Sequence, residues 1–491
     1  MSRGRTIGRR APAAAVDPST LPQVEIESLD QEGRGVARLD GLTVFVDGAL
    51  PGERVRVAIH RRKPTYAFAS AAVIERASAE RVSPRCPHFG TCGGCAMQHL
   101  QPRAQVAAKQ RVLEEALLHI ARLRAGMMLS PIHGPTWHYR YRARLSVRRV
   151  VKKGGVLVGF HERNSSYIAD MRECHVLSRV VADLLVPLRE LVEGLSIAER
   201  MPQIEVAISD GERDILGAAP LPHCALVFRN LAPLTPEDEA RLRAFADAHR
   251  VQIFLQPKGP ETAHPLYPAE PALLEYRLPE FGVGLQFSPT EFTQVNHAIN
   301  EVLVRRAIGL LDPRPGERIA DFFCGLGNFS LPIASRGAEV IGIEGARSLV
   351  ERAAANAARN GLSALARFEV GDLFKADGDT LERLGRFDKW LVDPPRDGAI
   401  ELVKAIGEPG ANGMPLPPPS RIVYVSCNPA TLARDAAVLV HAKGYVLRAA
   451  GVVNMFPHTG HVESVAWFEH DPAAVISAAE PGQSLQTGHC L

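Results

Sequence analysis

The sequence predicts an α/β protein that has a doubly wound parallel sheet in its C-terminal part and two further domains before it. Residues 276–470 alternate short β-branched strands with helical segments, which is the pattern of a parallel sheet covered by helices on both faces. Residues 21–79 contain short apolar runs separated by glycines, which is typical of a small β-barrel. Residues 80–275 mix strands and helices and predict a central α+β domain. The length of 491 residues fits about three domains.

Composition restricts the class of protein. A hydrophobic content of 46%, a charged content of 23% and a net charge of +3 are ordinary for a globular protein, so whole-chain charge is weak evidence for a nucleic-acid partner. No apolar run approaches the roughly 20 residues that span a bilayer, so we expect no membrane partner. Eight cysteines without a secretion signal favour a reducing cytoplasm, where thiols serve metal binding or catalysis.

The two ends of the chain do not predict folded structure. Residues 1–20 are expected to be a disordered basic arm, because Met1–Arg10 carries four arginines and no acid. An organellar transit peptide has a similar composition, but we favour an arm that touches nucleic acid. Residues 471–491, with Cys490, are expected to be a disordered tail.

Basic side chains gather on the hairpin of the predicted barrel that follows Val57. They either form a solvated edge that blocks strand pairing or contact the phosphates of an oligonucleotide. These side chains are Arg54, Arg56, His60, Arg61, Arg62 and Lys63. Glu27–Gly35 and Val44–Glu53 resemble the TRAM domain, an RNA-binding barrel that is attached to RNA-modifying enzymes.

Three cysteines within ten residues, Cys86, Cys92 and Cys95, indicate a metal site. A disulfide would leave one thiol over and would need an oxidising compartment. Thiolates bind either zinc or an iron–sulfur cluster, and both need a fourth ligand. His88 or His99 would complete a zinc site, whereas Cys174 would complete a four-thiolate site, for which spacing alone allows either metal.

The central region continues with a predicted helix, Leu100–Leu123, and a strand, Trp137–Arg149. In a strand, the arginines at positions 140, 142, 144 and 148 would share one face. They form either a solvated face or a contact with the RNA backbone, which we favour because like charges repel unless an anion covers them. Thr235–Asp238 predicts a helix start with a capping threonine, and that helix runs to about His249.

The C-terminal domain places polar motifs where its strands end, which is where ligands bind in open α/β sheets. The expected strands are Arg318–Phe323, Glu339–Ile343, Ala366–Val370, Asp388–Val392, Ile422–Val425, Tyr445–Val453 and Val462–Phe468, and the expected helices include Phe329–Ser335 and Ala346–Asn360. A glycine turn at Gly325–Asn328 and acidic strand ends indicate a nucleoside. Ser330 replaces the third glycine of a dinucleotide site, which favours S-adenosylmethionine.

Cys427 follows the strand Ile422–Val425 directly and is a candidate nucleophile. By itself it can equally be a buried free cysteine. Beside a methyl donor, a thiolate can add to C6 of uracil and make C5 nucleophilic, after which a base must remove the C5 proton. Glu463 is the candidate base. Glu463 and the neighbouring His458 and His461 can also form a loop with satisfied polar side chains or a metal triad, although the spacing matches no common zinc motif.

Four motifs together resemble the RNA uracil-5-methyltransferases. They are DFFCGLGNFSLP from Asp321, DPPRDG from Asp393, YVSCNPATLARD from Tyr424 and MFPHTGHVES from Met455, and the resemblance spans Val24 to Phe468. It implies a class I, Rossmann-like methyltransferase domain with Cys427 as nucleophile and Glu463 as general base. The implied S-adenosylmethionine site is Gln294, Phe323, Asn328, Glu344, Asp372 and Asp393, where family members often carry Asn in place of Asp372.

Within this family, the cysteines and the TRAM segment together point to the branch that acts on 23S ribosomal RNA. The resemblance implies that Cys86, Cys92, Cys95 and Cys174 bind a 4Fe-4S cluster. It also implies that the helix within residues 99–124 returns to the catalytic domain, so that the central domain would be discontinuous. We expect 23S ribosomal RNA as the partner, a monomer, and a cytoplasmic location.

Three other functions fit parts of the sequence. A non-enzymatic RNA-binding or redox-sensing iron–sulfur protein would have no reason to carry Cys427 and Glu463 together. An amino-group methyltransferase also uses an Asp-Pro-Pro motif, but its next residue is usually aromatic, where this chain has Arg396. The third alternative is the same chemistry on a different uridine of 23S or transfer RNA.

Overall fold

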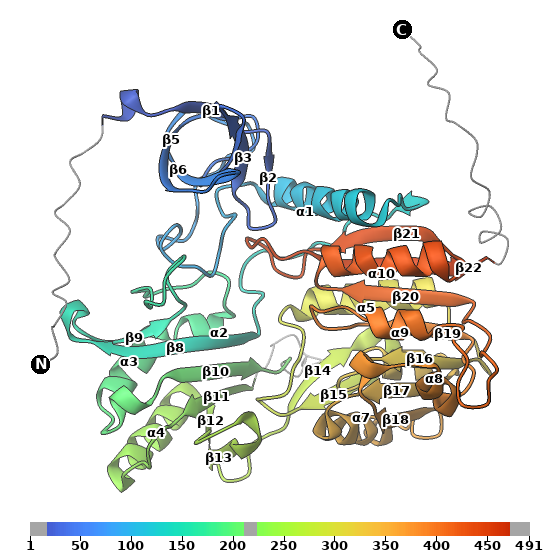
Figure 1. Ribbon diagram of the computed structural model, residues 1–491. Helices are drawn as coiled ribbons and strands as arrows, with labels where there is room; N and C mark the ends of the chain where they lie inside the picture. The colour runs from blue at the N-terminus through green and yellow to red at the C-terminus, as the bar shows by residue number, and fades with distance from the viewer. Residues whose placement is uncertain (1–16, 211–222, 472–491) are drawn as a thin grey trace, which may run out of the picture.

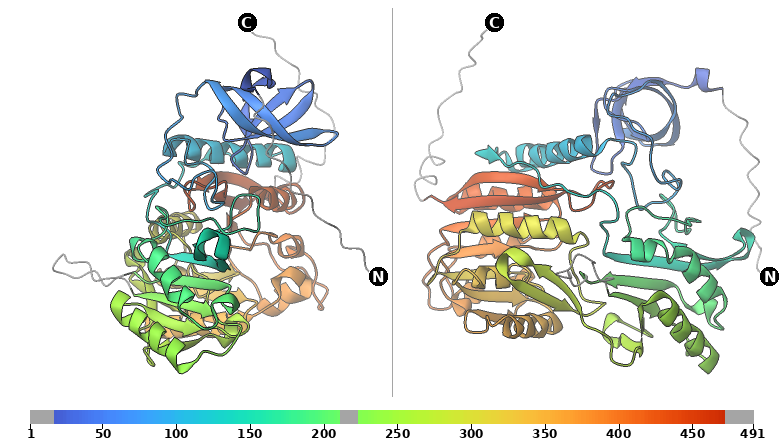
Figure 2. Two further views of the ribbon diagram at one scale, coloured as in Figure 1. Left: turned by 90° about the vertical axis from the view of Figure 1, so that its left-hand side faces the viewer. Right: turned by 180° about the vertical axis from the view of Figure 1, so that it is seen from behind.

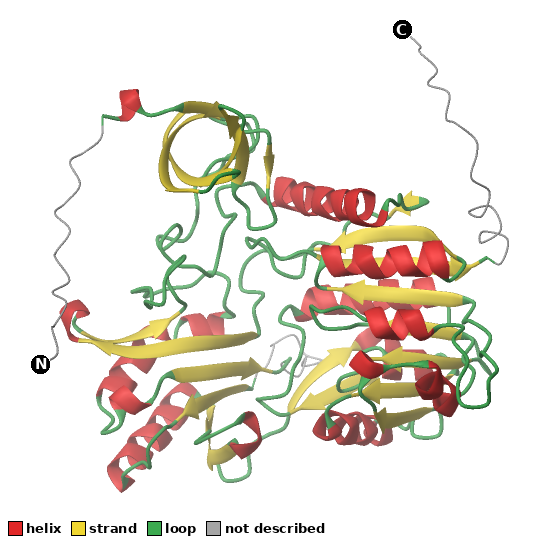
Figure 3. Ribbon diagram, in the orientation of Figure 1, coloured by secondary structure: helices red, strands yellow, loops and turns green. Residues whose placement is uncertain are grey.

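A computed structural model describes residues 17–210 and 223–471 of the chain. Within them, a barrel, a central sheet and a large C-terminal sheet lie as three separate groups of strands (Figures 1 and 3). None of the helices in the described ranges combines the length and apolar character needed to cross a membrane. The tail and most of the expected basic arm lie outside the described residues, but Pro18–Thr20, expected to be disordered, form a 3-10 turn.

The N-terminal domain is a six-stranded barrel with the strand order β1-β5-β6-β4-β3-β2. Its strands are β1 (Gln23–Glu25), β2 (Ser28–Leu29), β3 (Gly35–Leu39), β4 (Leu42–Asp47), β5 (Arg54–Arg62) and β6 (Tyr66–Arg76). Burial alternates along β4, where Val44 and Val46 are fully buried and Phe45 between them faces outward. The period of two fills the barrel with small β-branched side chains, as the sequence predicted.

The central domain is a six-stranded sheet with the order β13-β12-β11-β10-β8-β9. Its elements are β8 (Arg142–Val150), β9 (Gly155–Gly159), α2 (Arg179–Ala182), α3 (Leu185–Glu193), β10 (Gln203–Ile208), β11 (Cys224–Arg229), α4 (Pro236–His249), β12 (Gln252–Leu255) and β13 (His264–Tyr267). The predicted start of α4 is confirmed, because Thr235 and Asp238 form a reciprocal capping box.

The strand expected at Trp137–Arg149 begins only at Arg142, and residues 137–141 form a loop instead. Two of the four arginines are also engaged by neighbouring segments, whereas Arg148 is exposed. Arg144 Nε donates to Glu205 Oε1 at 2.9 Å, and Arg142 donates to the carbonyl of Pro289 at 2.9 Å. Glu205 lies opposite Arg144 on β10, so the neighbouring strand supplies the anion that the sequence analysis assigned to RNA.

The C-terminal domain is an eight-stranded sheet with the order β18-β17-β16-β19-β20-β22-β21-β7. Its strands are β7 (Met127–Met128), β16 (Arg318–Phe322), β17 (Glu339–Glu344), β18 (Ala366–Val370), β19 (Lys389–Val392), β20 (Arg421–Ser426), β21 (Tyr445–Val453) and β22 (Glu463–His470). The strands from β18 to β20 are parallel, and β22 runs antiparallel to both of its neighbours. A doubly wound sheet is therefore confirmed.

Helices cover both faces of this sheet. On one face α5 (His297–Leu311), α6 (Ser330–Ala334) and α7 (Arg347–Arg359) enclose a core that includes Val423 and Val425. On the other face α8 (Gly378–Leu384), α9 (Ile400–Ala405) and α10 (Pro429–Ala442) enclose a core that includes Ile422 and Tyr424. Successive residues of β20 therefore enter different cores, which explains its continuous apolar run.

A helix from far upstream packs on the same face as α10. It is α1 (Pro102–Ala116), which continues as a short π-helical turn, Leu117–Ala121. Its residues Val106 and Leu113 belong to the core of the C-terminal sheet. Figure 2 shows α1 lying between the barrel and β21. The remaining two-stranded sheet, β14 (Leu274–Leu278) and β15 (Val283–Phe287), leads into the C-terminal domain.

Candidate functional site

A cavity of about 860 Å³ opens at the carboxyl ends of β16 to β20. Strand β16 lies between β17 and β19, so this edge is the point where the strand order reverses and where open α/β sheets bind ligands. All eight residues that the sequence assigned to catalysis and to S-adenosylmethionine line this one cavity. They are Gln294, Phe323, Asn328, Glu344, Asp372, Asp393, Cys427 and Glu463.

The turn after β16 approaches the cavity with its backbone. Phe323, Gly325 and Gly327 have φ values of +64°, +55° and +97°, so the chain turns sharply in a left-handed conformation. Glycine adopts this conformation without a steric penalty, whereas Phe323 adopts it only because the surrounding fold imposes it. A backbone in this conformation brings peptide groups close to a ligand.

The two predicted acids Glu344 and Asp372 differ in their position and exposure at the cavity. Glu344, at the end of β17, accepts hydrogen bonds from the N–H groups of Gly325 and Ala346 at 3.2 and 3.1 Å, so its carboxylate is held in place beside the glycine turn. Asp372 is exposed at the rim, where a hydrogen bond from Lys375 lowers its pKa. Asp372 also accepts a hydrogen bond from the N–H of Phe374 at 3.2 Å, so both carboxylates are held, and the two differ in exposure.

A network of amides fixes Asn328. Its side chain exchanges hydrogen bonds with Asn300 at 2.9 and 3.1 Å, and it accepts one from the Tyr276 hydroxyl at 2.9 Å. Asn300 and Tyr276 are buried, and neither belongs to a motif of the resembled family. They hold the glycine turn against α5 and β14.

Carboxyl groups gather beneath and around the cavity. Burial raises the pKa of Asp393 to about 7. Burial, together with the negative charges of Asp393 and Glu344, also raises the pKa of Asp321 to about 7, although Ser330 donates to Asp321 at 2.5 Å. Such a cavity favours a cationic ligand, because positive charge restores the ionised form of its acids.

The register of β20 and β22 places Cys427 next to Glu463, the predicted nucleophile and the predicted base. Ser426 pairs with Ser464 in this antiparallel ladder, so Cys427 and Glu463 follow at adjacent positions. Burial and then the charges of Glu463 and Asp393 raise the pKa of Cys427 to about 11, against the opposing effect of Arg396. Burial and Asp393 raise the pKa of Glu463 to about 8, while Lys109 and Arg396 act to lower it.

Polar and aromatic side chains complete the wall. Arg396 donates to His461 at 3.2 Å, and both line the cavity together with Cys427. Phe292 and Phe374 line it while leaving 69% and 48% of their surfaces exposed, which offers flat apolar faces to a planar ring.

The segment Asn454–His461, which we call the base loop, leads directly into Glu463. It is held by residues of other domains: the N–H groups of Ala96 and Met97 donate to the carbonyl of His458 at 2.8 and 3.0 Å. The Tyr139 hydroxyl donates to the carbonyl of Pro457 at 2.9 Å. At Gly460, an added Cβ would lie 2.2 Å from the carbonyl oxygen of Gln31 in the barrel.

Two residues of α1 also hold the base loop, and no sequence motif points to them. Gln105 accepts from the N–H of His458 at 2.8 Å, and Lys109 donates to Asn454 and Phe456. Both side chains are buried, although they are polar. The sequence indicates Lys109 only by its position in the helix. It lies three residues after Val106 and four before Leu113, so a charged residue stands on the apolar stripe.

The four predicted cysteine ligands line a second, small cavity between the barrel and the central sheet. Cys86, Cys92, Cys95 and Cys174 all contribute to it, and all four are free thiols. Of the two histidines considered for zinc, His88 lines this cavity but accepts a hydrogen bond from the N–H of Arg172 at 3.2 Å, whereas His99 does not line it. The residues therefore favour four thiolates over three thiolates and one imidazole.

This arrangement differs from a site for one ion. Within residues 17–210 and 223–471, no group of three or more His, Cys, Asp or Glu side chains is arranged to hold a single metal ion. Burial raises the pKa of Cys95 to about 12 and that of Cys174 to about 11, and the charges of neighbouring cysteines add to both shifts. Four thiolates at this place would repel one another unless a cationic group lay between them.

Comparison with known proteins gives two family matches and close relatives. Residues 282–471 match the family model for tRNA (Uracil-5-)-methyltransferase, and residues 22–72 match the TRAM domain, which confirms the predicted TRAM segment. The chain is 61% identical over 451 residues to the 23S rRNA (uracil(1939)-C(5))-methyltransferase RlmD of Aromatoleum aromaticum, covering 92% of this chain and 100% of that protein. It is 57% identical to the protein of the same name from Chromobacterium violaceum, over 92% of this chain and 85% of the relative.

A solved structure has the same fold. The tRNA (uracil-54, C5)-methyltransferase of Pyrococcus abyssi, in complex with S-adenosyl-L-homocysteine, superposes with a TM-score of 0.66 at 24% identity. The match covers 91% of this chain and all of that one. The methyltransferase fold predicted from the strand and helix pattern is therefore confirmed.

The buried Asp321 predicts a pH-dependent stability. Because its folded-state pKa of about 7 lies above the ordinary value of 3.8, the folded protein holds a proton that the unfolded chain releases, and the free energy of unfolding falls as the pH rises from about 4 to about 7. We expect Asp321→Asn to reduce this fall. The difference in melting temperature between pH 5 and pH 7.5, without ligand, measures this fall. A change of 1 kcal/mol in the free energy of unfolding shifts the melting temperature by roughly 2–4 °C. Asp379→Asn, on the exposed side of α8, is the matched control, and an unchanged slope in Asp321→Asn would contradict the assignment.

Proposed function

Because the chain belongs to the family of 23S rRNA (uracil(1939)-C(5))-methyltransferases, we propose that it transfers a methyl group from S-adenosylmethionine to C5 of a uridine in 23S ribosomal RNA. The observation that carries this proposal is the position of Cys427 and Glu463, adjacent in the β20–β22 ladder and both at the wall of one cavity. A protein that only binds RNA has no use for a half-buried thiol beside a half-buried carboxyl group.

S-adenosylmethionine fits the half of the cavity that lies at the carboxyl ends of β16 to β18. The glycine turn brings backbone close to the ligand, and Glu344 offers a fixed carboxylate to ribose hydroxyls. The ligand carries a sulfonium and an amino group, so its positive charge meets Asp393 and the buried Asp321. Gln294, Phe323 and Asn328 complete this half of the cavity.

The reaction begins at Cys427. Its sulfur adds to C6 of the uracil ring, and the electron pair of the C5–C6 bond moves toward C5 and the O4 carbonyl. C5 then attacks the sulfonium methyl group, the bond from that methyl group to the sulfonium sulfur breaks, and its electron pair leaves with the sulfur of S-adenosylhomocysteine. Burial and the nearby acids raise the pKa of Cys427, and the cationic donor lowers the cost of forming the thiolate, whose proton passes to solvent. Arg396, at the same wall, is placed to stabilise the negative charge on the ring.

Elimination requires Glu463. After methyl transfer C5 still carries its proton, and this proton must leave before the C6–sulfur bond can break. An ionised Glu463 accepts the proton, the electrons of the C5–H bond re-form the C5–C6 double bond, and the sulfur departs with its own pair. A base with a pKa of about 8 is well matched to this step near neutral pH.

The barrel supports binding of RNA. On the outer face of β4 and β6, Phe45, Tyr66 and Phe68 lie within 6.0 Å of one another between ring centroids. Arg34 lies 5.3 and 5.0 Å from the ring centroids of Phe45 and Phe68. Aromatic rings with nearby guanidinium groups form stacking platforms for unpaired bases.

The four cysteines fit a 4Fe-4S cluster. They line one cavity, carry no disulfide and supply four sulfur ligands, the number that such a cluster needs. Cys95 is followed directly by Ala96 and Met97, which hold the base loop through their N–H groups. A bound cluster would supply positive iron centres that keep the four sulfurs as thiolates. It would thereby fix the segment that holds the base loop, which is a structural role as a clasp between domains.

A reducing cytoplasm suits these thiols. The site is complete within one chain, in agreement with a monomer.

Removing the nucleophile tests covalent catalysis. We expect Cys427→Ala to abolish methyl transfer to a 23S RNA fragment, with a loss of at least ~10³-fold, while RNA binding remains, because no other thiol can replace it at this position. Transfer of the labelled methyl group and a filter-binding assay measure the two properties. Cys224→Ala, which removes a buried thiol of β11 outside the cavity, is the control. Turnover of Cys427→Ala close to that of the wild type would rule out the mechanism.

Removing the base separates the two halves of the reaction. Glu463→Gln can still add Cys427 and transfer the methyl group, so we expect a covalent RNA–protein adduct to accumulate. The adduct appears as a shifted band on a denaturing gel. Glu469→Gln makes the same change on the same strand, where Glu469 pairs with Arg421 and Arg448 instead of facing the cavity. If Glu463→Gln gives no band, Glu463 is not the base.

Metal analysis tests the cluster. Protein purified without oxygen is expected to be brown and to contain about four iron and four sulfide ions per chain. Cys174→Ser should lose both the iron and the visible absorption, whereas Cys224→Ser should keep them. Zinc in place of iron would contradict the cluster.

A further inference from the structure

Lys109 is a buried cation whose presence the mechanism above does not use. Its side chain, in the middle of α1, is 2% exposed. Its ammonium donates to Asn454 Oδ1 and to the carbonyl of Phe456, both at 2.8 Å. Both acceptors are neutral, so these bonds do not offset the cost of burying a charge. A nearby anion, or loss of the proton, is needed to make this position favourable.

The base loop connects Lys109 to Glu463. Val453 pairs with Glu463 in the ladder of β21 and β22, and the next residue, Asn454, is the one that accepts from Lys109. Phe456, the second acceptor, lines the catalytic cavity. The ammonium therefore lies in the wall behind the catalytic base.

We propose that Lys109 is a positioning residue that increases the ionised fraction of Glu463 for removal of the C5 proton, an inference that rests on the proposed function. In this step the proton moves from C5 to a carboxylate oxygen of Glu463, the C5–C6 double bond re-forms, and the Cys427 sulfur leaves with its electron pair. Burial lowers the pKa of Lys109 to about 7, and the negative charge of Glu463 opposes this shift, so the ammonium and the carboxylate each favour the ionised form of the other. The charge of Lys109 stabilises the carboxylate before the step, and its hydrogen bonds hold the loop on which the carboxylate depends.

The charges around the pair agree with this role. The ionisable groups that face Glu463 or Lys109 are Asp393 and Arg396 after β19, Cys427 after β20, and His458 and His461 in the base loop. Of these, Asp393 raises the pKa of Glu463, whereas Arg396 lowers it. Lys109 is the second cation that lowers the pKa of Glu463, and Glu463 in turn opposes the loss of the Lys109 proton. Without Lys109, Glu463 would be protonated over a wider pH range.

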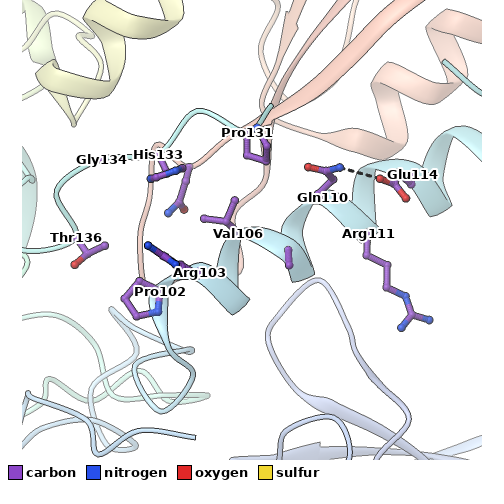
Figure 4. A pocket seen from close by; sticks show the side chains of 12 residues that line it. Pro102, Arg103, Val106, Gln110, Arg111, Glu114, Pro131, His133, Gly134 and Thr136 are labelled. Atoms are coloured by element: carbon purple, nitrogen blue, oxygen red, sulfur yellow. Dashed lines mark hydrogen bonds between the residues drawn. The ribbon is translucent and has the colours of Figure 1, made fainter. Parts of the chain in front are cut away.

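The two polar residues on the buried side of α1 have separable effects. Gln105 lies one turn before Lys109 and binds both the backbone and the ring of His458, with Nε2 3.1 Å from Nδ1. It is neutral and can only hold the loop. Lys109 holds the same loop at Asn454 and Phe456 and also brings a positive charge to it. A neighbouring side of α1 lines a pocket together with Pro131, His133 and Asn454, and the Arg111 side chain extends away from Pro131 and His133 (Figure 4).

The test compares three variants with the wild type at pH 7 and pH 9. Lys109→Met keeps most of the side-chain length without the charge, Lys109→Arg keeps the charge, and Glu463→Gln removes the base. Each is incubated with S-adenosylmethionine and a 23S RNA fragment, and methylated product and covalent adduct are quantified. A rise of one unit in the pKa of Glu463 corresponds to about tenfold less carboxylate.

We expect Lys109→Met to form product about tenfold more slowly than the wild type at pH 7 and to accumulate adduct, and to recover at pH 9. Lys109→Arg should accumulate less adduct than Lys109→Met at pH 7. Glu463→Gln should accumulate adduct at both pH values. Arg111→Met is the matched control, because it removes a charge from the same helix at a residue that pairs with Glu115 in solvent.

Two results would overturn the inference. One is a wild-type pH profile in Lys109→Met. The other is a folded Lys109→Met, judged by its melting temperature and binding of S-adenosylhomocysteine, that loses activity at both pH values without adduct, since this would mean a purely structural role. Failure of Glu463→Gln to form adduct would instead overturn the proposed function.

Discussion

The antiparallel pairing of β22 with β20 is the contact on which the rest of this structure depends. It places Ser464 opposite Ser426 and therefore sets Glu463 beside Cys427 at the edge of the sheet. Side chains of a strand alternate between faces, so a shift of one residue would move the base away from the thiol. Both strands are buried on both faces by the two helix layers, and this packing fixes the register.

The base loop is the meeting point of the three domains. The barrel meets it at Gly460, the segment after Cys95 holds His458, and the central domain reaches Pro457 through Tyr139. Helix α1 adds contacts from the buried side of the catalytic domain.

The cavity and the core beneath it hold acids in an environment that disfavours their charge. Asp321, Asp393 and Glu463 all have raised pKa values because they are buried near one another. This arrangement costs stability at neutral pH, and a cationic methyl donor would recover part of that cost on binding. The same low-dielectric environment strengthens the effect of each fixed cation on Glu463, so Arg396 and Lys109 can influence the base from the wall.

Local sequence determined much of this protein. The strands of the C-terminal sheet, the glycine turn, the capping box at Thr235 and the thiol of Cys427 at a strand end follow from patterns within short segments, because periodicity, turn chemistry and strand ends are local properties. The complete set of cofactor residues, Gln294 among them, came from the resemblance to a family. Only the tertiary structure decided which distant groups meet. Glu205 neutralises Arg144 across a ladder between strands 61 residues apart, and Lys109 meets Asn454 over 345 residues. Such pairs depend on how separately formed elements pack, and the free energy that selects one packing is shared among side chains from several domains.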